Sequence, residues 1–261
     1  MPVLLVGCGR MGSAIARGCA GSEEIMVLDP FAKTLPDGAR RIDSTETIAS
    51  DDLVVVLAVK PQTFASLGPS LRMLATGGAL FVSIMAAIPL ADLRAALGGT
   101  QRIVRAMPNT PAAIGRGITA AAADGTIDAT DRSRVEMLLA PTGAFLWLDD
   151  EAQMDAVTAV SGSGPAYFFR FAEALAVAGE KAGLQPSLAM RLARATFIGA
   201  AALAEQDEAA LAELRRQVTS PGGTTAAGLA EMNRDNAIDH LAEVVVGAAA
   251  TRSRALARQL D

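Results

Sequence analysis

The sequence predicts an α/β protein, with a doubly wound parallel sheet in the first half of the chain and an all-α region in the second. Three observations lead to this prediction. Short apolar runs alternate with helical segments through the first half. A glycine-rich stretch, "GCGRMG", follows the first apolar run. Beyond Gln153 no run is typical of a strand.

The apolar runs of the first half lack the polar alternation of half-exposed strands, which is typical of strands buried on both faces. Four of these runs lie at residues 2–7, 25–29, 53–59 and 79–84. The helical segments that follow them lie at residues 10–20, 44–50, 62–74 and 90–97. Because strand–helix–strand repeats form right-handed crossovers, the pattern predicts a parallel sheet. Three later runs are expected to extend it, at residues 102–107, 117–123 and 144–148.

The second half of the chain predicts helices at residues 165–183, 186–206, 207–217, 225–232 and 235–260. Pro165 suits a first helical turn, and Asp207 is expected to cap the third of these helices. The run from Ala195 to Ala204 is apolar nearly all round, which requires burial. A small helical domain cannot hide every such face alone. We therefore expect a second copy of the chain to pack on it, most simply as a two-fold dimer.

Composition and charge exclude several classes of function. The 261 residues carry a formal net charge of -5, whereas nucleic-acid binding needs a basic face. The apolar stretch from Ala195 is far shorter than the about 20 residues of a membrane span. The N-terminus lacks the basic flank of a signal peptide. Cys8 and Cys19 suit neither a disulfide framework nor a metal site, so we expect reduced thiols, no metal and a cytoplasmic protein.

The motif "GCGRMG" predicts a dinucleotide-binding turn of the Rossmann type. Gly7, Gly9 and Gly12 form G-x-G-x-x-G between a strand and a helix. The first glycine permits a tight turn, the second lets a pyrophosphate approach the backbone, and the third lets helix and strand pack closely. Arg10 and Met11 open the helix, whose N-terminus favours an anion, and are candidate cofactor-binding residues with the glycines. A glycine-rich turn without a ligand is the alternative.

Asp29 ends the second predicted strand, where a carboxylate accepts hydrogen bonds from the adenosine ribose. A 2′-phosphate at that place would meet a like charge. No arginine follows immediately, although Lys33 could reach in. The sequence therefore predicts NAD(P)H as the cofactor, with NADH favoured over NADPH. Alternatively, Asp29 merely starts a turn with Pro30.

Two proline turns follow further predicted strands, in "AVKPQ" and "MPNTPA". In a doubly wound sheet the ligand crevice lies at the carboxyl ends of the strands. The candidate cofactor-binding residues in these turns are Ala58, Val59, Lys60, Pro61, Gln62, Asn109 and Thr110.

Two loops of small residues, "SGSGPAY" and "TSPGGTT", interrupt the helical half, and a helix follows each of them. With Ser220 as N-cap and Pro221 in the first turn, the N–H groups of residues 222–225 can point outward together. The hydroxyls of Ser220, Thr224 and Thr225 add uncharged donors. A small carboxylate suits such an anion nest. An ordinary hydroxyl cap with a tight turn is the alternative.

Taken in order, "GCGRMG", "AVKPQ", "MPNTPA", "AVSGSGPAYFF" and "QVTSPGGTTAAGL" resemble pyrroline-5-carboxylate reductases over nearly the whole chain. The resemblance implies that NAD(P)H reduces the C=N bond of 1-pyrroline-5-carboxylate to give L-proline, the last step of proline biosynthesis. It also implies a Rossmann-like cofactor domain, residues 1–150, and an α-helical dimerisation and substrate-binding domain, residues 151–261. In this family the helical domains intertwine into a homodimer, often assembled further into a decamer, and the active sites combine residues of two subunits.

The resemblance assigns candidate substrate residues. The family's carboxylate-binding loop falls on Ser220, Gly223, Thr224 and Thr225. Thr225 matches the hydroxyl that faces the imine nitrogen and is the candidate catalytic residue. Glu151, in "EAQMDAVT", matches an acidic position near the substrate.

The chain departs from the family pattern at three places. Ala86–Ala87 replaces an alanine–glycine pair, and the extra methyl is expected to tighten the nicotinamide side of the crevice. Arg216 stands where an aspartate is common, which removes any contact that the carboxylate would make. "DPFAK" stands where many relatives carry Ser, Asn or Arg, in agreement with the cofactor preference argued from Asp29.

Two other functions remain open at this point. A β-hydroxyacid dehydrogenase has the same two-domain layout but needs a base, usually a lysine on the first helix of the second domain. Lys181 is the best candidate, yet it lies near the end of that helix. A redox sensor could bind the dinucleotide without turnover, but the two hydroxyl-rich loops would then be unexplained.

Overall fold

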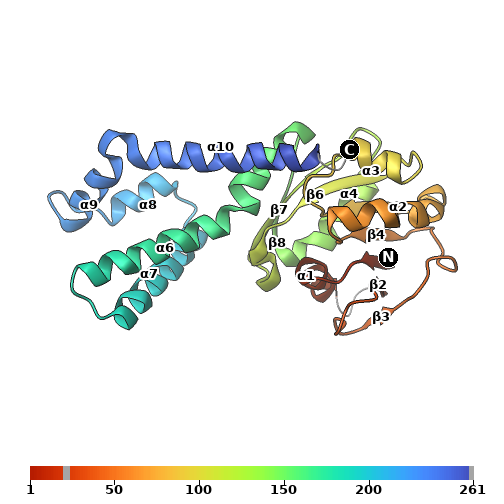
Figure 1. Ribbon diagram of the computed structural model, residues 1–261, viewed down its shortest axis with the longest axis horizontal. Coiled ribbons are helices and arrows are strands. Elements are labelled where there is room, and N and C mark those ends of the chain that lie inside the picture. The colour runs from red at the N-terminus through yellow and green to blue at the C-terminus, as the bar shows by residue number, and fades with distance from the viewer. Residues whose placement is uncertain (20–23, 259–261) are drawn as a thin grey trace. The chain divides into compact units, whose positions relative to one another are not determined.

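The computed structural model of the chain describes residues 1–19 and 24–258. They form two compact units (Figure 1). The first, here called the sheet unit, comprises Met1–Ser163 and Ala248–Asp261, and the second, the helical unit, comprises Gly164–Gly247. The division of the chain into domains at residue 150 stays a prediction. The side chain of Cys19 lies outside the described part.

The sheet unit contains one eight-stranded sheet with the strand order β3-β2-β1-β4-β5-β6-β7-β8. The strands are β1 (Val3–Val6), β2 (Ile25–Leu28), β3 (Ala39–Arg41), β4 (Val54–Leu57), β5 (Leu80–Ser83), β6 (Ile103–Met107), β7 (Gly117–Ala122) and β8 (Gly143–Trp147). Every neighbouring pair is parallel except β6 and β7. The predicted α/β class and all seven predicted strands are confirmed.

Helices cover both faces of the sheet. On one face, α1 (Arg10–Cys19) and α4 (Ala129–Leu139) pack against alternate strand residues such as Val3 and Leu5. On the other, α2 (Pro61–Thr76) and α3 (Leu90–Ala96) pack against the intervening residues. The central strands are therefore buried on both faces, which is why their sequences show no polar alternation.

The helix predicted at residues 44–50 does not form, and this prediction is wrong. The backbone N–H of Glu46 donates to the Ser44 hydroxyl at 3.2 Å, and the N–H of Ile48 donates to the Thr45 carbonyl at 3.2 Å. Short hydroxyl side chains compete in this way with helical hydrogen bonds and favour turns. The short strand β3 lies just before these turns and has no counterpart among the predicted runs.

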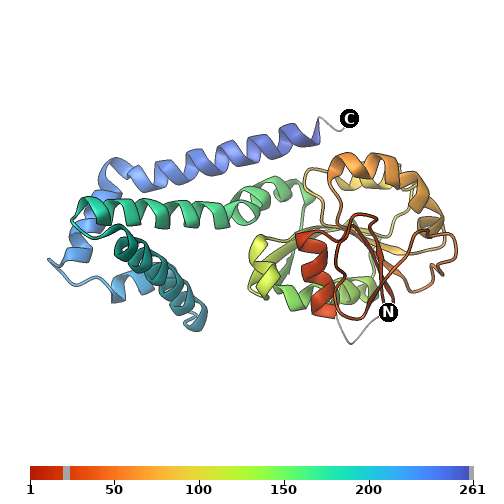
Figure 2. The same ribbon diagram turned by 60° about the horizontal axis from the view of Figure 1, so that its bottom comes forward.

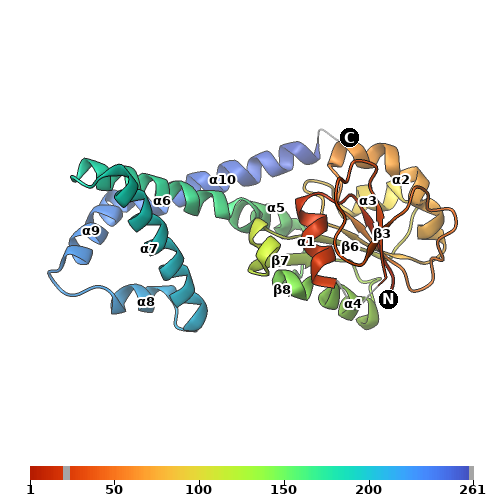
Figure 3. The ribbon, with the colours of Figure 1, turned by 90° about the horizontal axis from the view of Figure 1, so that it is seen from below.

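The helical unit contains the predicted series of helices. They are α6 (Gly164–Lys181), α7 (Pro186–Gln206), α8 (Leu211–Gln217), α9 (Thr224–Asn233) and most of α10 (Ala237–Ala257), the end of which belongs to the sheet unit. Helices α6 and α7 lie side by side (Figures 2 and 3). Asp207 does not cap α8 as predicted. It follows α7, and its carboxylate accepts a hydrogen bond from the N–H of Ala209 at 2.9 Å, in a turn before α8 begins.

The apolar run on α7 is not buried within the single chain. Ile198 is 58% exposed and Leu203 60% exposed. Among the described helices, α7 alone is long and apolar enough, by length and composition, to span a membrane. The sequence analysis underestimated the apolar length of this helix, because it considered only the run from Ala195. One such helix is weak support for a span, because a helix that packs against other protein has the same composition.

Candidate active site

The strand order reverses between β1 and β4. The chain runs outward from β1 through β2 to β3 and then crosses back to β4 on the other side of β1. In an open α/β sheet, the ligand crevice forms beside such a reversal, at the carboxyl ends of the two strands. Gly7 directly follows β1 and Ala58 directly follows β4, and the N–H of Ala58 donates to the Val6 carbonyl at 2.8 Å. The two sequence motifs "GCGRMG" and "AVKPQ" therefore meet at one edge of the sheet.

The glycines of the first motif have the spatial roles that the sequence predicts. Gly7 has a φ of +94°, and a Cβ built there would lie 2.8 Å from the Ala58 carbonyl oxygen. A Cβ on Gly12 would lie 2.5 Å from the Gly7 carbonyl oxygen, which no side chain can tolerate. A Cβ on Gly9 would meet nothing within 4 Å. The structure thus leaves no room for a side chain at Gly7 and Gly12, but there is free space beside Gly9. This free space fits a pyrophosphate lying against the backbone.

The start of α1 adds donors to this open backbone. The first intrahelical bond runs from the N–H of Ser13 to the Gly9 carbonyl at 2.9 Å. The N–H groups of Arg10, Met11 and Gly12 precede it and have no partner of their own within the helix. Amides at a helix N-terminus carry partial positive charge and favour an anion. The Ser13 hydroxyl donates to the Cys8 carbonyl at 3.1 Å and fixes the loop in this shape.

Asp29 stands at the end of β2 and holds two backbone amides. One carboxylate oxygen accepts from the N–H of Cys8 at 2.7 Å, and the other accepts from the N–H of Phe31 at 2.8 Å. The second bond stabilises the turn after Asp29, which the sequence analysis gave as the alternative role of this residue. The first ties the end of β2 to the glycine-rich loop. An ionised carboxylate has about four acceptor sites. Asp29 can therefore still accept a ribose hydroxyl.

The residues of "AVKPQ" form the other wall of the crevice. Val59 approaches the glycine-rich loop, since its Cγ1 would lie 2.8 Å from a Cβ on Gly7. Lys60 is the N-cap of α2, Pro61 is the first residue of that helix, and Gln62 is exposed in its first turn. These polar groups lie at the predicted edge of the sheet.

Asn109 lies at the same edge of the sheet, and its side-chain amide already makes two hydrogen bonds within the protein. Its amide oxygen accepts from the N–H of Ile118 at 3.0 Å, and its amide nitrogen donates to the Ser161 hydroxyl at 3.3 Å. The sequence predicts a loop at Ser161. The structure instead places this residue in a π-helical turn, Thr158–Gly162. Such turns are frequent at functional sites. Thr110 opens a 3₁₀ turn, Thr110–Ile114, and is exposed.

Glu151 holds together parts of the sheet unit that are distant in sequence. Its Oε1 accepts from the N–H of Leu90, the first residue of α3, at 2.9 Å, and from Nη1 of Arg105 at 2.8 Å. Arg105 is buried within β6, where a lone charge would be costly without this partner. Sequence reasoning missed Arg105. The signal was a charged residue inside the apolar run "RIVRAM", which requires a carboxylate partner.

Helix α3 is anchored at its other end too. Arg94 forms an ion pair with Asp124, which follows β7. Burial by itself raises the pKa of Asp124, but hydrogen bonds from Thr126 and the contact with Arg94 outweigh it and lower the pKa overall. Both ends of α3 are therefore held by residues distant in sequence, and the segment 84–89 joins β5 to this helix.

Within this segment, Ala87 has a left-handed backbone conformation, with a φ of +64°, and is buried. Its position is the one at which the resemblance implies a glycine. An L-residue in this conformation costs about 1–2 kcal/mol, so Ala87→Gly is expected to leave the free energy of unfolding unchanged or to raise it slightly. The matched substitution Ala16→Gly, at a buried position with ordinary helical geometry in α1, is expected to lower that free energy by at least about 1 kcal/mol. Denaturant unfolding of both variants checks this. Equal losses would show that Ala87 is not strained.

The loop "TSPGGTT" differs from its predicted form. Ser220 is not the N-cap of α9. It begins a tight turn in which the N–H of Gly223 donates to the Ser220 carbonyl at 3.0 Å and Gly222 has a φ of +70°. This is the geometry that a Pro–Gly pair favours. Gly223 is the N-cap, and α9 begins at Thr224.

This difference changes the set of outward amides. The N–H of Gly223 is used inside the turn, and the first intrahelical bond runs from Ala227 to Gly223 at 3.1 Å. The amides at the helix start are therefore those of Thr224, Thr225 and Ala226. Ser220, Thr224 and Thr225 are exposed beside them. Hydroxyls and amides are thus gathered as an anion site requires, with the first free amide two residues later than predicted.

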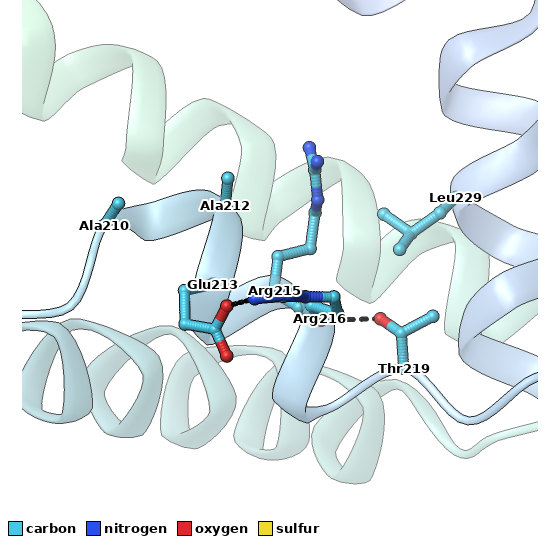
Figure 4. A pocket seen from close by; sticks show the side chains of 7 residues that line it. All are labelled: Ala210, Ala212, Glu213, Arg215, Arg216, Thr219 and Leu229. Carbon is cyan, nitrogen blue, oxygen red and sulfur yellow. Dashed lines mark hydrogen bonds and ion pairs between the residues drawn. The ribbon is translucent and has the colours of Figure 1, made fainter.

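An open hollow of about 550 Å³ lies next to this loop, between α8 and α9 (Figure 4). Thr219 and Leu229 contribute to its lining, but none of the predicted substrate residues does. Arg216 forms an ion pair with Glu213, and the Arg215 side chain points away from this pair. Arg216, at the position where the resemblance implies an aspartate, is therefore paired with a carboxylate of its own helix.

The fold and the glycine-rich crevice define a dinucleotide-dependent oxidoreductase with an appended helical unit. Residues 2–87 match the family described as "NADP oxidoreductase coenzyme F420-dependent", and residues 151–256 match "Pyrroline-5-carboxylate reductase dimerisation". Along 99% of its length the chain is 42% identical to the pyrroline-5-carboxylate reductase of Pseudomonas aeruginosa, of which 97% is covered. The chain belongs to the pyrroline-5-carboxylate reductase family.

Solved structures agree with this assignment. The pyrroline-5-carboxylate reductase of Coxiella burnetii superposes with a TM-score of 0.88 at 32% identity, over 97% of both chains. The pyrroline carboxylate reductase of Plasmodium falciparum, solved with NADP bound, superposes with a TM-score of 0.81 at 28% identity, over 98% of both chains. The chain therefore shares the fold of these two proteins along nearly its whole length.

Proposed function

We propose that this protein is a pyrroline-5-carboxylate reductase, which transfers hydride from NAD(P)H to the C=N carbon of 1-pyrroline-5-carboxylate and so forms L-proline. The observation that carries the proposal is the hydroxyl-rich loop at the start of α9, in a chain whose sheet unit has the glycine cradle of a dinucleotide site. The glycine-rich turn at residues 7–12 alone would suit any dehydrogenase. The loop adds a place for a small carboxylate.

The cofactor would be held by residues of the sheet unit. Gly7, Gly9 and Gly12, with the amides of Arg10 and Met11, face the pyrophosphate, and Asp29 accepts from the adenosine ribose. The turns after β4 and β6 line the remainder, with Ala58, Val59, Lys60, Pro61, Gln62, Asn109 and Thr110. When bound, the reduced nicotinamide supplies the hydride.

The substrate would be held by residues of the helical unit. Amides in the first turn of α9 and the hydroxyls of Ser220 and Thr224 bind the carboxylate and decide which face of the ring is presented. The hydroxyl of Thr225 donates or accepts at the imine nitrogen. An alcohol is too weak an acid to protonate that nitrogen, so water or already protonated substrate supplies the proton. Glu151 adds a carboxylate near the substrate, in addition to its bonds to Leu90 and Arg105.

The test of this proposal follows the absorbance of reduced nicotinamide with 1-pyrroline-5-carboxylate, in parallel with NADH and with NADPH. We expect imine-dependent oxidation with both cofactors and a higher kcat/KM for NADH, because Asp29 suits a free ribose hydroxyl better than a 2′-phosphate. A higher kcat/KM for NADPH would overturn the argument from Asp29 and leave the reductase assignment intact. Binding of both cofactors without oxidation would favour the redox-sensor alternative.

We also propose that the helical unit forms a homodimer and that these dimers assemble further into a decamer. Large apolar side chains remain exposed on α6 and α7 in the single chain, for example Phe171 and Ile198. A second copy would cover them more simply than a lipid bilayer, so the proposal includes no membrane and a cytoplasmic location. In such a dimer the two sets of residues that act on one imine can come from different copies.

The β-hydroxyacid dehydrogenase alternative is not favoured. Its base would have to be Lys181, which is the last residue of α6 and is exposed. A base at the end of a helix of this length lies far from the helix start, where the chemistry would require it.

A further inference from the structure

The unpredicted strand β3 brings two consecutive arginines beside β2. Arg40 lies opposite Met26 and Arg41 opposite Val27 in the parallel pair. Their side chains extend toward opposite ends of β2. Arg40 forms an ion pair at 3.0 Å with Glu24, which precedes the strand. Nη2 of Arg41 donates to the carbonyl of Ala32, in the turn that follows the strand.

This turn is part of the proposed ribose site. Asp29 holds it by the bond from the Phe31 N–H to its carboxylate, at 2.8 Å, and the same carboxylate holds the glycine-rich loop through Cys8. The guanidinium of Arg41 therefore lies at the carboxyl edge of the sheet, next to the turn that Asp29 stabilises. It is exposed, and its bond is to a neutral carbonyl. It can thus exchange this acceptor for a charged one.

A 2′-phosphate is the group that distinguishes NADPH from NADH, and it carries nearly two negative charges and three acceptor oxygens. Asp29 alone would repel it. A guanidinium binds phosphate through two parallel hydrogen bonds, which a lysine ammonium cannot make. We propose that Arg41 recognises the 2′-phosphate of NADPH and thereby offsets Asp29, so that the protein binds both cofactors. This inference rests on the proposed cofactor site but not on the identity of the imine.

Lys33 is the cation that the sequence suggested for this role. It lies on the same turn and is exposed. We prefer Arg41 as the phosphate-binding residue for two reasons. Its guanidinium is hydrogen-bonded to the turn, and its paired N–H donors match two phosphate oxygens. The residue comes from a strand too short to be recognised in the sequence, and its approach to Ala32 depends on the pairing of β3 with β2.

The test measures the affinity of the purified protein for NADPH and for NADH by fluorescence titration without imine. Arg41→Ala is expected to weaken NADPH binding about tenfold, the loss of one partly exposed charge-assisted contact, and to change NADH binding by less than about twofold. Arg41→Lys should restore part of the NADPH affinity. Arg40→Ala removes the same charge from the neighbouring residue, whose guanidinium faces the other end of the strand, and should change neither affinity.

Three outcomes would overturn the inference. Equal losses of NADPH affinity in Arg41→Ala and Arg40→Ala would show an effect of net charge alone. Equal losses of NADH and NADPH affinity in Arg41→Ala would show that the arginine only supports the turn. A loss in Lys33→Ala with none in Arg41→Ala would assign the phosphate to the lysine. Since no imine is present, failure of the proposed reductase activity would leave these binding results unaffected.

Discussion

Replacing Thr225 by alanine is expected to lower kcat for the imine about a hundredfold, the lower end of the loss caused by removing one hydrogen-bonding group positioned at the reacting atoms. The affinity for NADH should stay within about twofold of that of the parent protein, because the proposed cofactor residues all belong to the sheet unit. The comparison is made by steady-state kinetics at saturating cofactor and by cofactor titration without imine.

The position of Thr225 makes this substitution interpretable. It is the second residue of α9, its side chain is exposed, and within the described residues no hydrogen bond joins its hydroxyl to the rest of the chain. Its removal should therefore not disturb folding. Thr225→Ser keeps a hydroxyl at the same place and should retain most of the turnover. Turnover within about twofold of the parent in Thr225→Ala would exclude the proposed role.

Features set by neighbouring residues were predictable from the sequence. Gly7, Gly9 and Gly12 lie within six residues of one another, at the turn after β1 and the start of α1, so their spacing in the sequence already determines the local backbone shape. The long helix α7 was placed within its observed limits, because a proline and a change in polarity mark its ends. At Ser220 even a local prediction was wrong. Its side chain suits an N-cap, but the following Pro–Gly pair favours a turn, and the turn prevails.

Features that depend on pairing between distant segments were not predictable in this way. Arg41 reaches the turn after β2 only because a strand of three residues joins the edge of the sheet. Glu151 meets Arg105 across many intervening residues, and only the burial of β6 explains why a charge in that strand needs a carboxylate. Ala87 is left-handed in the segment before α3, and the two ends of that helix are held by Glu151 and Asp124, which lie far away in the sequence.

The second large effect is expected on α7, at Ile198. This side chain is 58% exposed in the single chain and belongs to the run that the sequence requires to be buried. Ile198→Glu would place a carboxylate in the proposed dimer interface twice, once in each copy. Burying an unpaired charge costs several kcal/mol. The dimer dissociation constant should therefore rise at least about a hundredfold, and sedimentation velocity at micromolar protein should detect monomers.

Imine reduction should fall together with the dimer if partner loops complete the active site. Met137→Glu is the matched control, because Met137 is also a large exposed apolar residue, 61% exposed, but lies on α4 of the sheet unit. It should keep both the dimer and the activity. Circular dichroism of Ile198→Glu should retain the helical signal, since α7 already faces solvent at this position in the single chain. A dimer of unchanged affinity would place the interface elsewhere. Monomers with full activity would show that one chain holds the complete site.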